Sequence, residues 1–481
     1  TNFVGSMLIS NDAGTGTLNA ASDNTGFGNE VFDDLTSGDN NTGIGAKALT
    51  KLTTGLANVA VGSSALEVNI AGTANTAVGY QALDANLASN NTAVGRSALT
   101  ANTTGATNTA VGLESLAANT TASDNTAVGK GSLTANTTGT GNIGIGATAG
   151  GSITTGNYNV AVGNDANGSV TTAANNTAMG YFALQDNTAA DNTAVGFNAL
   201  LQNSTGANNT AVGASSLDAN TTGADNVAIG VSALTAVTTG EQNVAIGKDA
   251  GLAITTGDNN VAVGEQSLIT ATTADKNTAL GSRALQLTTT GANNVAVGCL
   301  ALTANTTGEG NVAVGFNALA ANTTAADNVA VGANALLTTT TGANNTAVGI
   351  SALKLNTGGN NTAVGRGSLL NNSGGGANTA VGKDALNDNT TGDYNTAMGE
   401  GALDANTTAD NNTAIGLAAL GANTTGGANT AVGSSALDSN TTAANNTAVG
   451  FECLHTNTTG ADNTAMGHSA LALNSTGASN T

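Results

Sequence analysis

The sequence predicts an all-β fold: a β-solenoid (β-roll) of about 27 tandem coils, each seventeen residues long. Two observations lead to this prediction. A motif of the form Asn-Thr-Ala-Val-Gly recurs from Asn24 onward, and its closing glycine marks 27 copies between Gly28 and Gly467. The steps between these glycines are seventeen residues, apart from three of sixteen. This period is shorter than that of helical repeats or propeller blades and fits one coil of a solenoid.

The first column of the repeat is asparagine in all 27 copies, including Asn91, Asn209 and Asn345. Strand propensity does not favour asparagine, so a geometric requirement must keep it there. If the coils stack in register at about 4.8 Å, identical amides lie one above another and can hydrogen-bond along the axis. We therefore expect an asparagine ladder.

The next three columns predict a short strand. The second column is β-branched and the fourth is apolar, so these side chains, at i and i+2, share one face. The third column is alanine in 24 copies, including Ala211 and Ala228, and glycine in the other three. The small third column indicates close packing against its face. The invariant glycine that follows is expected to form a corner.

The remainder of each coil begins with two variable positions, which we expect on the outer surface. A small residue and a leucine follow, and the leucine is expected to supply the second inward side chain. Three coils lack this leucine, and an aliphatic residue three positions later is expected to fill the gap: Ile153 after Gly150, Val170 after Asn167 and Ile254 after Gly251. An Asn-Thr-Thr-Gly turn closes the coil. Each coil should therefore contain two short strands and two turns.

Composition agrees with a narrow solenoid and argues against several partners. The 481 residues include only 2% aromatic residues and no proline, so the core should be thin and made of Val, Ile, Leu and Ala. The net charge of −21 argues against nucleic acid and anionic membranes as partners. No apolar run is long enough to insert into a membrane.

Candidate sites for chemistry are weak, and the sequence predicts neither an enzyme nor a cofactor. Gly139–Gly144 spells GxGxxG but falls across a repeat turn with no following helix. Cys453 and His455, beside Glu452, are interpreted as chance surface substitutions. Cys299 and Cys453 lie nine repeats apart, too far for a disulfide within one chain. Three lysines follow a motif glycine, without the Ser or Thr of a phosphate loop: Lys130, Lys248 and Lys383.

Weak Ca²⁺ binding is the one metal interaction that the sequence suggests. Aspartates precede the first-column asparagine in several coils, and turn carboxylates can bind Ca²⁺. Their spacing is irregular, so no dedicated site is expected. These residues are Asp124, Asp191, Asp225, Asp327 and Asp462.

The repeat resembles the Asn-Thr-Ala-Val-Gly-x-x-Ala-Leu units of phage tail-fibre-domain proteins and related bacterial surface proteins. Asn91 to Leu99, NTAVGRSAL, shows the match, which covers residues 24–481. The repeat is more distantly similar to the β-roll heads of trimeric autotransporter adhesins. The resemblance implies a rigid, often trimeric, stalk or head at a cell surface or on a virion.

The chain is predicted to comprise an N-terminal capping coil, 1–23, and tandem repeats, 24–481, that end in mid-repeat. Phe3 and Leu8 replace small residues of the repeat, which suggests a bulky cap. Asn480 and Thr481 occupy the first two columns of a further coil. An uncapped end offers unpaired backbone to another chain, so head-to-tail association is expected if the ends meet.

The function expected from these features is that of a non-enzymatic, extracellular structural fibre whose partner is itself, with a host or surface receptor as a further possible partner. In one alternative, the chain forms trimers in which the alanine column faces partner chains. In another, the ends join into a filament and the alanine column only fits a narrow interior. A third alternative is an ice- or surface-binding solenoid that uses threonine ladders.

Overall fold

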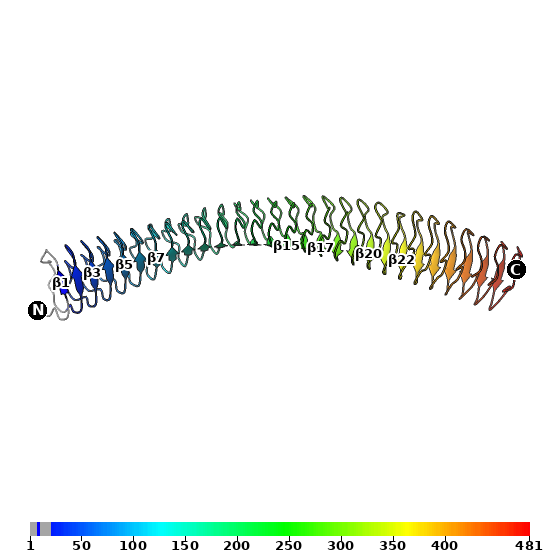
Figure 1. Ribbon diagram of the computed structural model, residues 1–481, viewed down its shortest axis with the longest axis horizontal. Helices are drawn as coiled ribbons and strands as arrows, with labels where there is room; N and C mark the ends of the chain where they lie inside the picture. Colours follow the sequence, from blue (N-terminus) through cyan, green and yellow to red (C-terminus); the bar gives the residue numbers. More distant parts are fainter. Residues whose placement is uncertain (1–6, 10–20) are drawn as a thin grey trace. The chain divides into compact units, whose positions relative to one another are not determined.

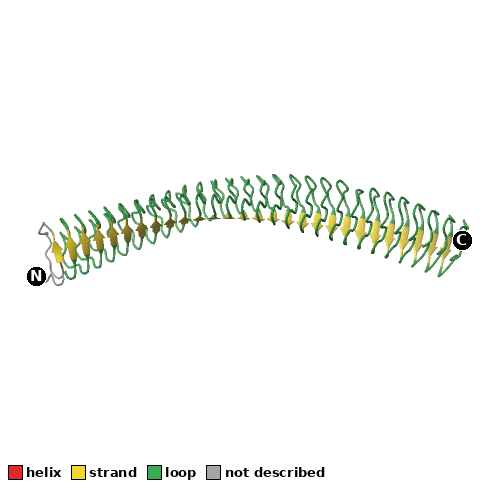
Figure 2. Cartoon of the chain, viewed as in Figure 1, coloured by secondary structure: helices red, strands yellow, loops and turns green. Residues whose placement is uncertain are grey.

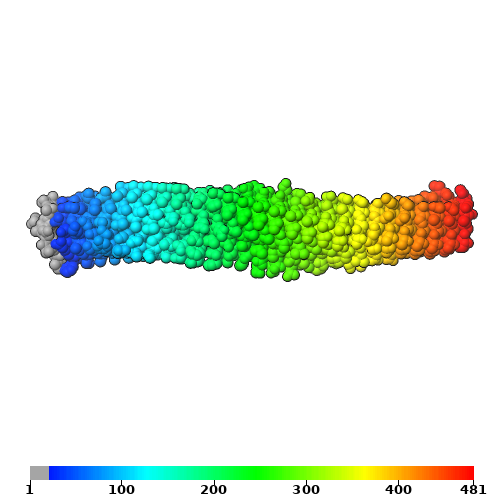
Figure 3. All heavy atoms as spheres, turned by 90° about the horizontal axis from the view of Figure 1, so that it is seen from above, coloured from blue at the N-terminus to red at the C-terminus, as the bar shows by residue number. Residues whose placement is uncertain are grey.

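The computed structural model describes residues 7–9, as backbone, and residues 21–481. It comprises two compact units, residues 1–241 and 242–481, each of which is a parallel β-solenoid (Figure 1). Every strand has three residues, and no helix occurs in these described ranges. Within each unit the atoms follow the chain order, because each coil packs on its neighbours (Figure 3). The predicted solenoid fold, with one coil per repeat, is confirmed.

Unit 1 contains fourteen described strands, which pair in parallel in chain order from β1 to β14. Equivalent columns face each other, so Thr92 pairs with Thr109 and Ala93 with Ala110. The strands are β1 (Met7–Ile9), β2 (Thr25–Phe27), β3 (Thr42–Ile44), β4 (Val59–Val61), β5 (Thr76–Val78), β6 (Thr92–Val94), β7 (Thr109–Val111), β8 (Thr126–Val128), β9 (Ile143–Ile145), β10 (Val160–Val162), β11 (Thr177–Met179), β12 (Thr193–Val195), β13 (Thr210–Val212) and β14 (Val227–Ile229).

Unit 2 has the same parallel, in-register pairing from each strand to the next. Its strands are β15 (Val244–Ile246), β16 (Val261–Val263), β17 (Thr278–Leu280), β18 (Val295–Val297), β19 (Val312–Val314), β20 (Val329–Val331), β21 (Thr346–Val348), β22 (Thr362–Val364), β23 (Thr379–Val381), β24 (Thr396–Met398), β25 (Thr413–Ile415), β26 (Thr430–Val432), β27 (Thr447–Val449) and β28 (Thr464–Met466).

Each described coil contains one strand, so the prediction of two strands per coil is wrong. The segment after the glycine corner is a series of turns, drawn as loop in Figure 2. Alternate residues there have positive φ, 56° at Ser97 and 52° at Leu99, which folds the segment too tightly for a strand. Its peptide groups still hydrogen-bond along the axis: Ser97 N–H donates to the Tyr80 carbonyl and Leu99 N–H to the Ser115 carbonyl.

The core of each coil lies between the middle residue of the strand and the leucine of the turn segment. Ala93 and Leu99 are fully buried, whereas Val94 points outward and is 37% exposed. The expectation that valine belongs to the core is therefore wrong. The interior is narrow: at Gly144 even the Cβ of an alanine would lie 2.4 Å from Ser132 Oγ and 2.9 Å from Leu133 Cγ in the preceding coil. In neighbouring coils the alanine of this column is fully buried, and such close packing restricts the column to alanine and glycine.

Two sequence predictions about the coil are confirmed. Ile153 is fully buried, and its Cδ1 would lie 3.0 Å from a Cβ on Gly150, so it fills the space of the missing leucine. The motif glycine is a corner with positive φ, 142° at Gly95. A Cβ there would lie 2.3 Å from the carbonyl oxygen of Gly112, so the next coil leaves no room for a side chain.

Candidate functional site

The first-column asparagines form a buried ladder inside each unit. Asn91 N–H donates to Asn75 Oδ1 at 3.0 Å, and Asn108 N–H donates to Asn91 Oδ1 at 2.9 Å. The side-chain Nδ2 of Asn91 donates to the Gly105 carbonyl at 2.9 Å. Asn209 and its neighbours repeat this pattern in unit 1. The axial hydrogen bonds expected of this column are therefore present.

The same ladder runs through unit 2. Asn345 donates from its backbone N–H to Asn328 Oδ1 at 2.9 Å and from Nδ2 to the same oxygen at 3.1 Å. Both side chains are fully buried. The amide oxygen thus takes the place of water for the buried backbone N–H of the asparagine in the next coil, one residue before the strand, which explains why no other residue type occurs there.

A second asparagine ladder, which the sequence analysis assigned only to turn chemistry, lies in the Asn-Thr-Thr-Gly turns. Asn119 Nδ2 donates to Asn102 Oδ1 at 2.8 Å, and both residues are fully buried. Asn102 Nδ2 also donates to the Gly105 carbonyl at 2.8 Å, the same oxygen that accepts from Asn91. One turn carbonyl therefore joins the two ladders within a coil. The recurrence of Asn at one turn position was the available signal.

The second ladder is interrupted where the turn lacks asparagine. In the coil that follows Asn136, the equivalent turn position is occupied by Ile153, whose side chain has no hydrogen-bond donor. The buried Oδ1 of Asn136 therefore has no partner. In unit 2, Thr339 occupies the equivalent position in the coil after Asn322, and the buried Oδ1 of Asn322 is also unpaired. Each interruption leaves a polar atom desolvated, which costs stability.

The alanine column lies inside the coil. Ala211 and Ala228 are fully buried within their own chain. A partner chain has no access to either side chain, so the expectation that this column faces neighbouring chains in a trimer is wrong. The small residues are required by the turn leucines of the same chain.

The outer side of the strands forms a regular apolar surface, which we call the strand face. It consists of the second- and fourth-column side chains, and in unit 1 these run from β2 to β14. Val78, Val94 and Val111 are 36–37% exposed, and Met179 is 44% exposed. The second-column residues beside them are partly exposed. Continuous exposed apolar surfaces of this kind are typical of interaction sites.

Threonines of the strand face retain free hydroxyls. Thr76, Thr92 and Thr109 make no side-chain hydrogen bond to any described residue. The first threonine of the turn differs, because Thr103 Oγ1 donates to the Thr120 carbonyl at 2.9 Å. Available hydroxyls therefore line up on the strand face beside the valines.

The two edges of the strand face differ in charge in unit 1. The residue before each first-column asparagine forms one edge, where Asp124, Asp191 and Asp225 are exposed. The residue after each motif glycine forms the other, where Arg96 and Lys130 are exposed. We call these two lines of residues the acidic edge and the basic edge. Arg96 and Lys130 are the two basic residues of the basic edge in the described coils of unit 1, and Arg96 Nη2 already pairs with Glu114 Oε1 at 2.9 Å.

Aromatic residues extend the basic edge near β11 and β12. Tyr181 and Phe197 are 45% and 53% exposed, and their rings stack with centroids 5.8 Å apart and planes within 5°. Met179 lies beside them in the fourth column. These coils therefore carry an exposed apolar patch at the edge of the unit 1 strand face.

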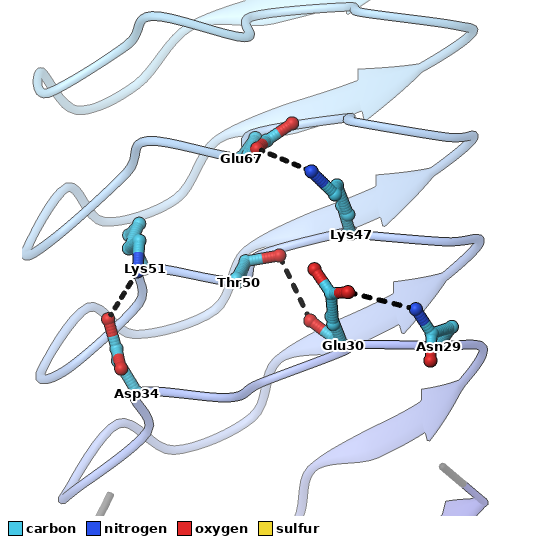
Figure 4. A network of polar contacts seen from close by, with 7 residues as sticks. All are labelled: Asn29, Glu30, Asp34, Lys47, Thr50, Lys51 and Glu67. Atoms are coloured by element: carbon cyan, nitrogen blue, oxygen red, sulfur yellow. Dashed lines mark hydrogen bonds and ion pairs between the residues drawn. The ribbon is translucent and has the colours of Figure 1, made fainter. Parts of the chain in front are cut away.

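Charged residues elsewhere in unit 1 pair from coil to coil. Lys51 Nζ lies 3.2 Å from Asp34 Oδ2, and Lys47 Nζ lies 3.7 Å from Glu67 Oε1; both contacts are drawn in Figure 4. Thr50 Oγ1 also donates to a backbone carbonyl of the preceding coil at 2.9 Å. Exposed pairs of this kind contribute about 0–1 kcal/mol each, so they adjust the surface rather than hold the coils together.

The residues considered for nucleophilic or phosphate chemistry do not form a constellation. Cys453 is fully buried, so its interpretation as a surface substitution is wrong: it occupies the small-residue position before the turn leucine, where its Sγ contacts the Ala465 carbonyl at 3.2 Å. Burial raises the pKa of its thiol. His455 Nδ1 lies 3.3 Å from the Ser435 carbonyl. The Gly139–Gly144 segment ends in β9, and no helix follows it.

The three lysines after motif glycines are exposed, and two of them form ion pairs. Lys248 Nζ lies 2.9 Å from Asp249 Oδ2, and Lys383 Nζ lies 2.9 Å from Glu400 Oε1. The hydrogen bond and charge of Glu400 raise the pKa of Lys383 and, reciprocally, those of Lys383 lower the pKa of Glu400.

The aspartates considered for Ca²⁺ lie singly at the acidic edge. Asp225 Oδ1 accepts from Asn208 Nδ2 at 3.2 Å, and Asp462 Oδ1 accepts from Asn445 Nδ2 at 3.1 Å. Among the described residues, no group of three or more His, Cys, Asp or Glu side chains is arranged to hold a metal. Weak Ca²⁺ binding stays a prediction.

The chain ends are described in part. Phe3 lies outside the described residues; Leu8 pairs through its backbone with Gly26, and its side chain is not described. Asn480 continues the first ladder, donating from Nδ2 to Asn463 Oδ1 at 2.7 Å, and Thr481 is exposed. Within the described part of the chain, there is no helix with the length and apolarity needed to cross a membrane.

Neither protein-family models nor curated proteins offer a relative: no family model matches the chain, and no curated protein is significantly similar to it.

Proposed function

We propose that the chain is a non-enzymatic structural shaft, a stiff rod that spaces or attaches other components outside the cell. The observation that supports this function best is the pair of buried asparagine ladders. In a coil such as Asn91–Thr107 they add three side-chain hydrogen bonds to the preceding coil and two within the coil. At about 1 kcal/mol each, these bonds repeat along the unit and oppose both bending and extension.

The surface suits a solvated fibre. The net charge of −21 keeps such a chain soluble and repels nucleic acid and anionic lipid. The Asn-Thr-Ala-Val-Gly repeat is similar to that of phage tail fibres and bacterial adhesins, so we assign the shaft to a virion or a cell surface. Its attachment to a receptor is part of this proposal.

Imaging of single molecules tests the proposal. Atomic force microscopy of the purified chain should show unbranched rods of uniform width, with a persistence length greater than the contour length. The same images test head-to-tail association, which would give filaments several rods long. Flexible, bead-like or compact particles would refute the structural role, as would a catalytic turnover assigned to the pure chain.

Ice or mineral binding is a second candidate, favoured by the threonine hydroxyls of the strand face. Thr76, Thr92 and Thr109 repeat at the strand spacing of about 4.8 Å and have no intramolecular partner for their side chains. Ordered hydroxyls beside valine methyls offer a regular surface to a lattice. Thermal hysteresis in the freezing of a chain solution would support this function, and its absence would exclude ice as the ligand.

A further inference from the structure

The strand face of unit 1 has the properties of an interface between two copies of the chain. We propose that it binds the same face of a second copy, with a twofold axis running along the stack of coils. The inference deepens the proposed structural role, because it names the partner that covers the exposed side of the shaft.

The area of the face is sufficient for a stable interface. The strand face spans the three strand residues, or about 10 Å, and coils repeat at about 4.8 Å. Each coil therefore offers roughly 50 Å², and the thirteen fully described strands of unit 1, from β2 to β14, offer roughly 620 Å². Two such faces bury roughly 1,250 Å² in total, which reaches the lower end of the range of specific interfaces.

The repeat itself favours a second copy over other proteins. A stripe with one valine per coil is matched along its whole length only by a surface with the same axial period, and the chain provides that surface. Despite the net charge of −21, the second and fourth columns contain no ionisable side chain. Two strand faces can therefore meet without burying a charge.

The charges at the two edges of the β8 coil favour one orientation of the two copies. A twofold axis along the stack places each coil opposite the same coil of the partner and the acidic edge opposite the basic edge. A twofold axis across the stack would place acidic edge against acidic edge, which like-charge repulsion disfavours. The parallel arrangement is therefore the one that the charges support.

One coil makes this arrangement specific. Asp124 and Lys130 lie on either side of β8, and both are exposed. Asp124 Oδ1 accepts a hydrogen bond from Thr107 Oγ1, and Lys130 forms no ion pair with a described residue. In the parallel dimer, Lys130 of each copy faces Asp124 of the other, which gives two ion pairs. The stacked rings of Tyr181 and Phe197 would provide an apolar anchor farther along the same edge.

The test uses the full chain and sedimentation velocity at concentrations from about 0.1 to 50 µM, a range that spans ordinary dimer affinities. The wild type should show twice the chain mass at the upper end. The double variant Val111→Glu and Val128→Glu should shift the dimer dissociation constant upward at least tenfold. The matched control, Thr104→Glu and Thr121→Glu, adds the same charge at exposed turn positions and should leave the constant unchanged.

A charge exchange tests the orientation. Lys130→Glu or Asp124→Lys alone should weaken the dimer at least tenfold, and the two together should restore it. Both residue types are already tolerated in these columns, because Glu265 follows a motif glycine and Lys276, with φ of 57°, precedes a first-column asparagine. Circular dichroism of each variant verifies folding.

Three outcomes would overturn the inference. These are a monomer throughout the range, three times the chain mass, and a dimer that the strand-face variant leaves intact. Failure of the charge exchange to restore binding would overturn the parallel orientation. Rods seen by microscopy in any of these cases would leave the structural role standing, so the two proposals fail separately.

Discussion

Replacing Asn91 with alanine measures what one rung of the first ladder contributes. The Asn91 amide is fully buried and makes four side-chain hydrogen bonds. Its Oδ1 accepts from Asn108 N–H at 2.9 Å and from Asn108 Nδ2 at 3.2 Å. Its Nδ2 donates to the Gly105 carbonyl at 2.9 Å and to Asn86 Oδ1 at 3.1 Å.

The loss of stability in Asn91→Ala depends on which of the four hydrogen-bond partners of Asn91 is left without any hydrogen bond. Asn108 Nδ2 keeps the Ala122 carbonyl, and Gly105 O and Asn86 Oδ1 keep Asn102 Nδ2, so each loses only one of two bonds. The buried Asn108 N–H loses its hydrogen-bond partner, which costs about 2 kcal/mol. With about 0.7 kcal/mol for each of the other three bonds, Asn91→Ala should destabilise its coil by about 4 kcal/mol.

Native-state hydrogen exchange detected by mass spectrometry suits this prediction, because coils of a solenoid open locally. Peptides around residues 91–108 should exchange about a thousandfold faster in the variant, the factor that corresponds to about 4 kcal/mol. Asn90→Gly is the matched control: Asn90 is exposed, has φ of 63°, and donates from its backbone to the Thr73 carbonyl, which glycine retains. Equal exchange in the two variants would refute the role of the ladder.

Four further perturbations test other parts of the coil. Gly95→Ala should destabilise its unit by several kcal/mol, because φ is 142° and the Cβ would meet a carbonyl oxygen at 2.3 Å; a melting temperature within 2 °C, or about 0.5 kcal/mol, of the wild type would contradict the close approach. Ile153→Ala should cost about 2–5 kcal/mol in local exchange, through the cavity beside a coil that already lacks its leucine. Thr339→Asn should stabilise unit 2 by about 1–2 kcal/mol, because it supplies a donor to the unpaired Oδ1 of Asn322. Unchanged hydrogen exchange of the peptides around Asn322 would argue against the second ladder. Burial raises the pKa of Asp218, so the folded chain holds this proton more tightly than the unfolded chain and stability should fall as pH rises from the ordinary value of 3.8 through the raised one. Asp218→Asn should remove that contribution, seen as a shallower pH dependence of the melting temperature; an unchanged dependence would contradict it.

Much of the fold could be predicted from the sequence because the same residue types recur at the same positions in 27 copies of the repeat. The invariant asparagine predicts an axial ladder, and Ile153 after Gly150 predicts a compensating side chain. Both depend on the stacking of identical coils, which a constant period imposes.

The inside and outside of the strand could not be predicted with the same success. Valine in the fourth column and alanine in the third column both suit a core by hydrophobicity. Alanine rather than valine faces the interior because the space between the strand and Leu99 is narrow. That narrowness depends on residues with positive φ in the turn segment. A leucine at φ of 52° is not predictable from propensity, so the second strand was predicted wrongly.

The candidate site, the strand face, follows from the same difference between the predicted and the observed direction of the strand side chains. With alanine inside, the valines of the strand face become the exposed apolar surface, and the charges of Asp124 and Lys130 become its edges. The single residues on either side of the motif vary from coil to coil. The occurrence of an aspartate and a lysine on either side of one strand, as at Asp124 and Lys130, therefore formed no recurring pattern in the sequence.

A cryo-electron microscopy reconstruction of the purified chain at side-chain resolution is the most direct test of this coil architecture. We expect one seventeen-residue repeat per coil at about 4.8 Å, with the alanine and both asparagine columns inside and the valine column on the surface. Density that places the valine column in the interior, or that leaves the first-column amides facing solvent, would contradict it.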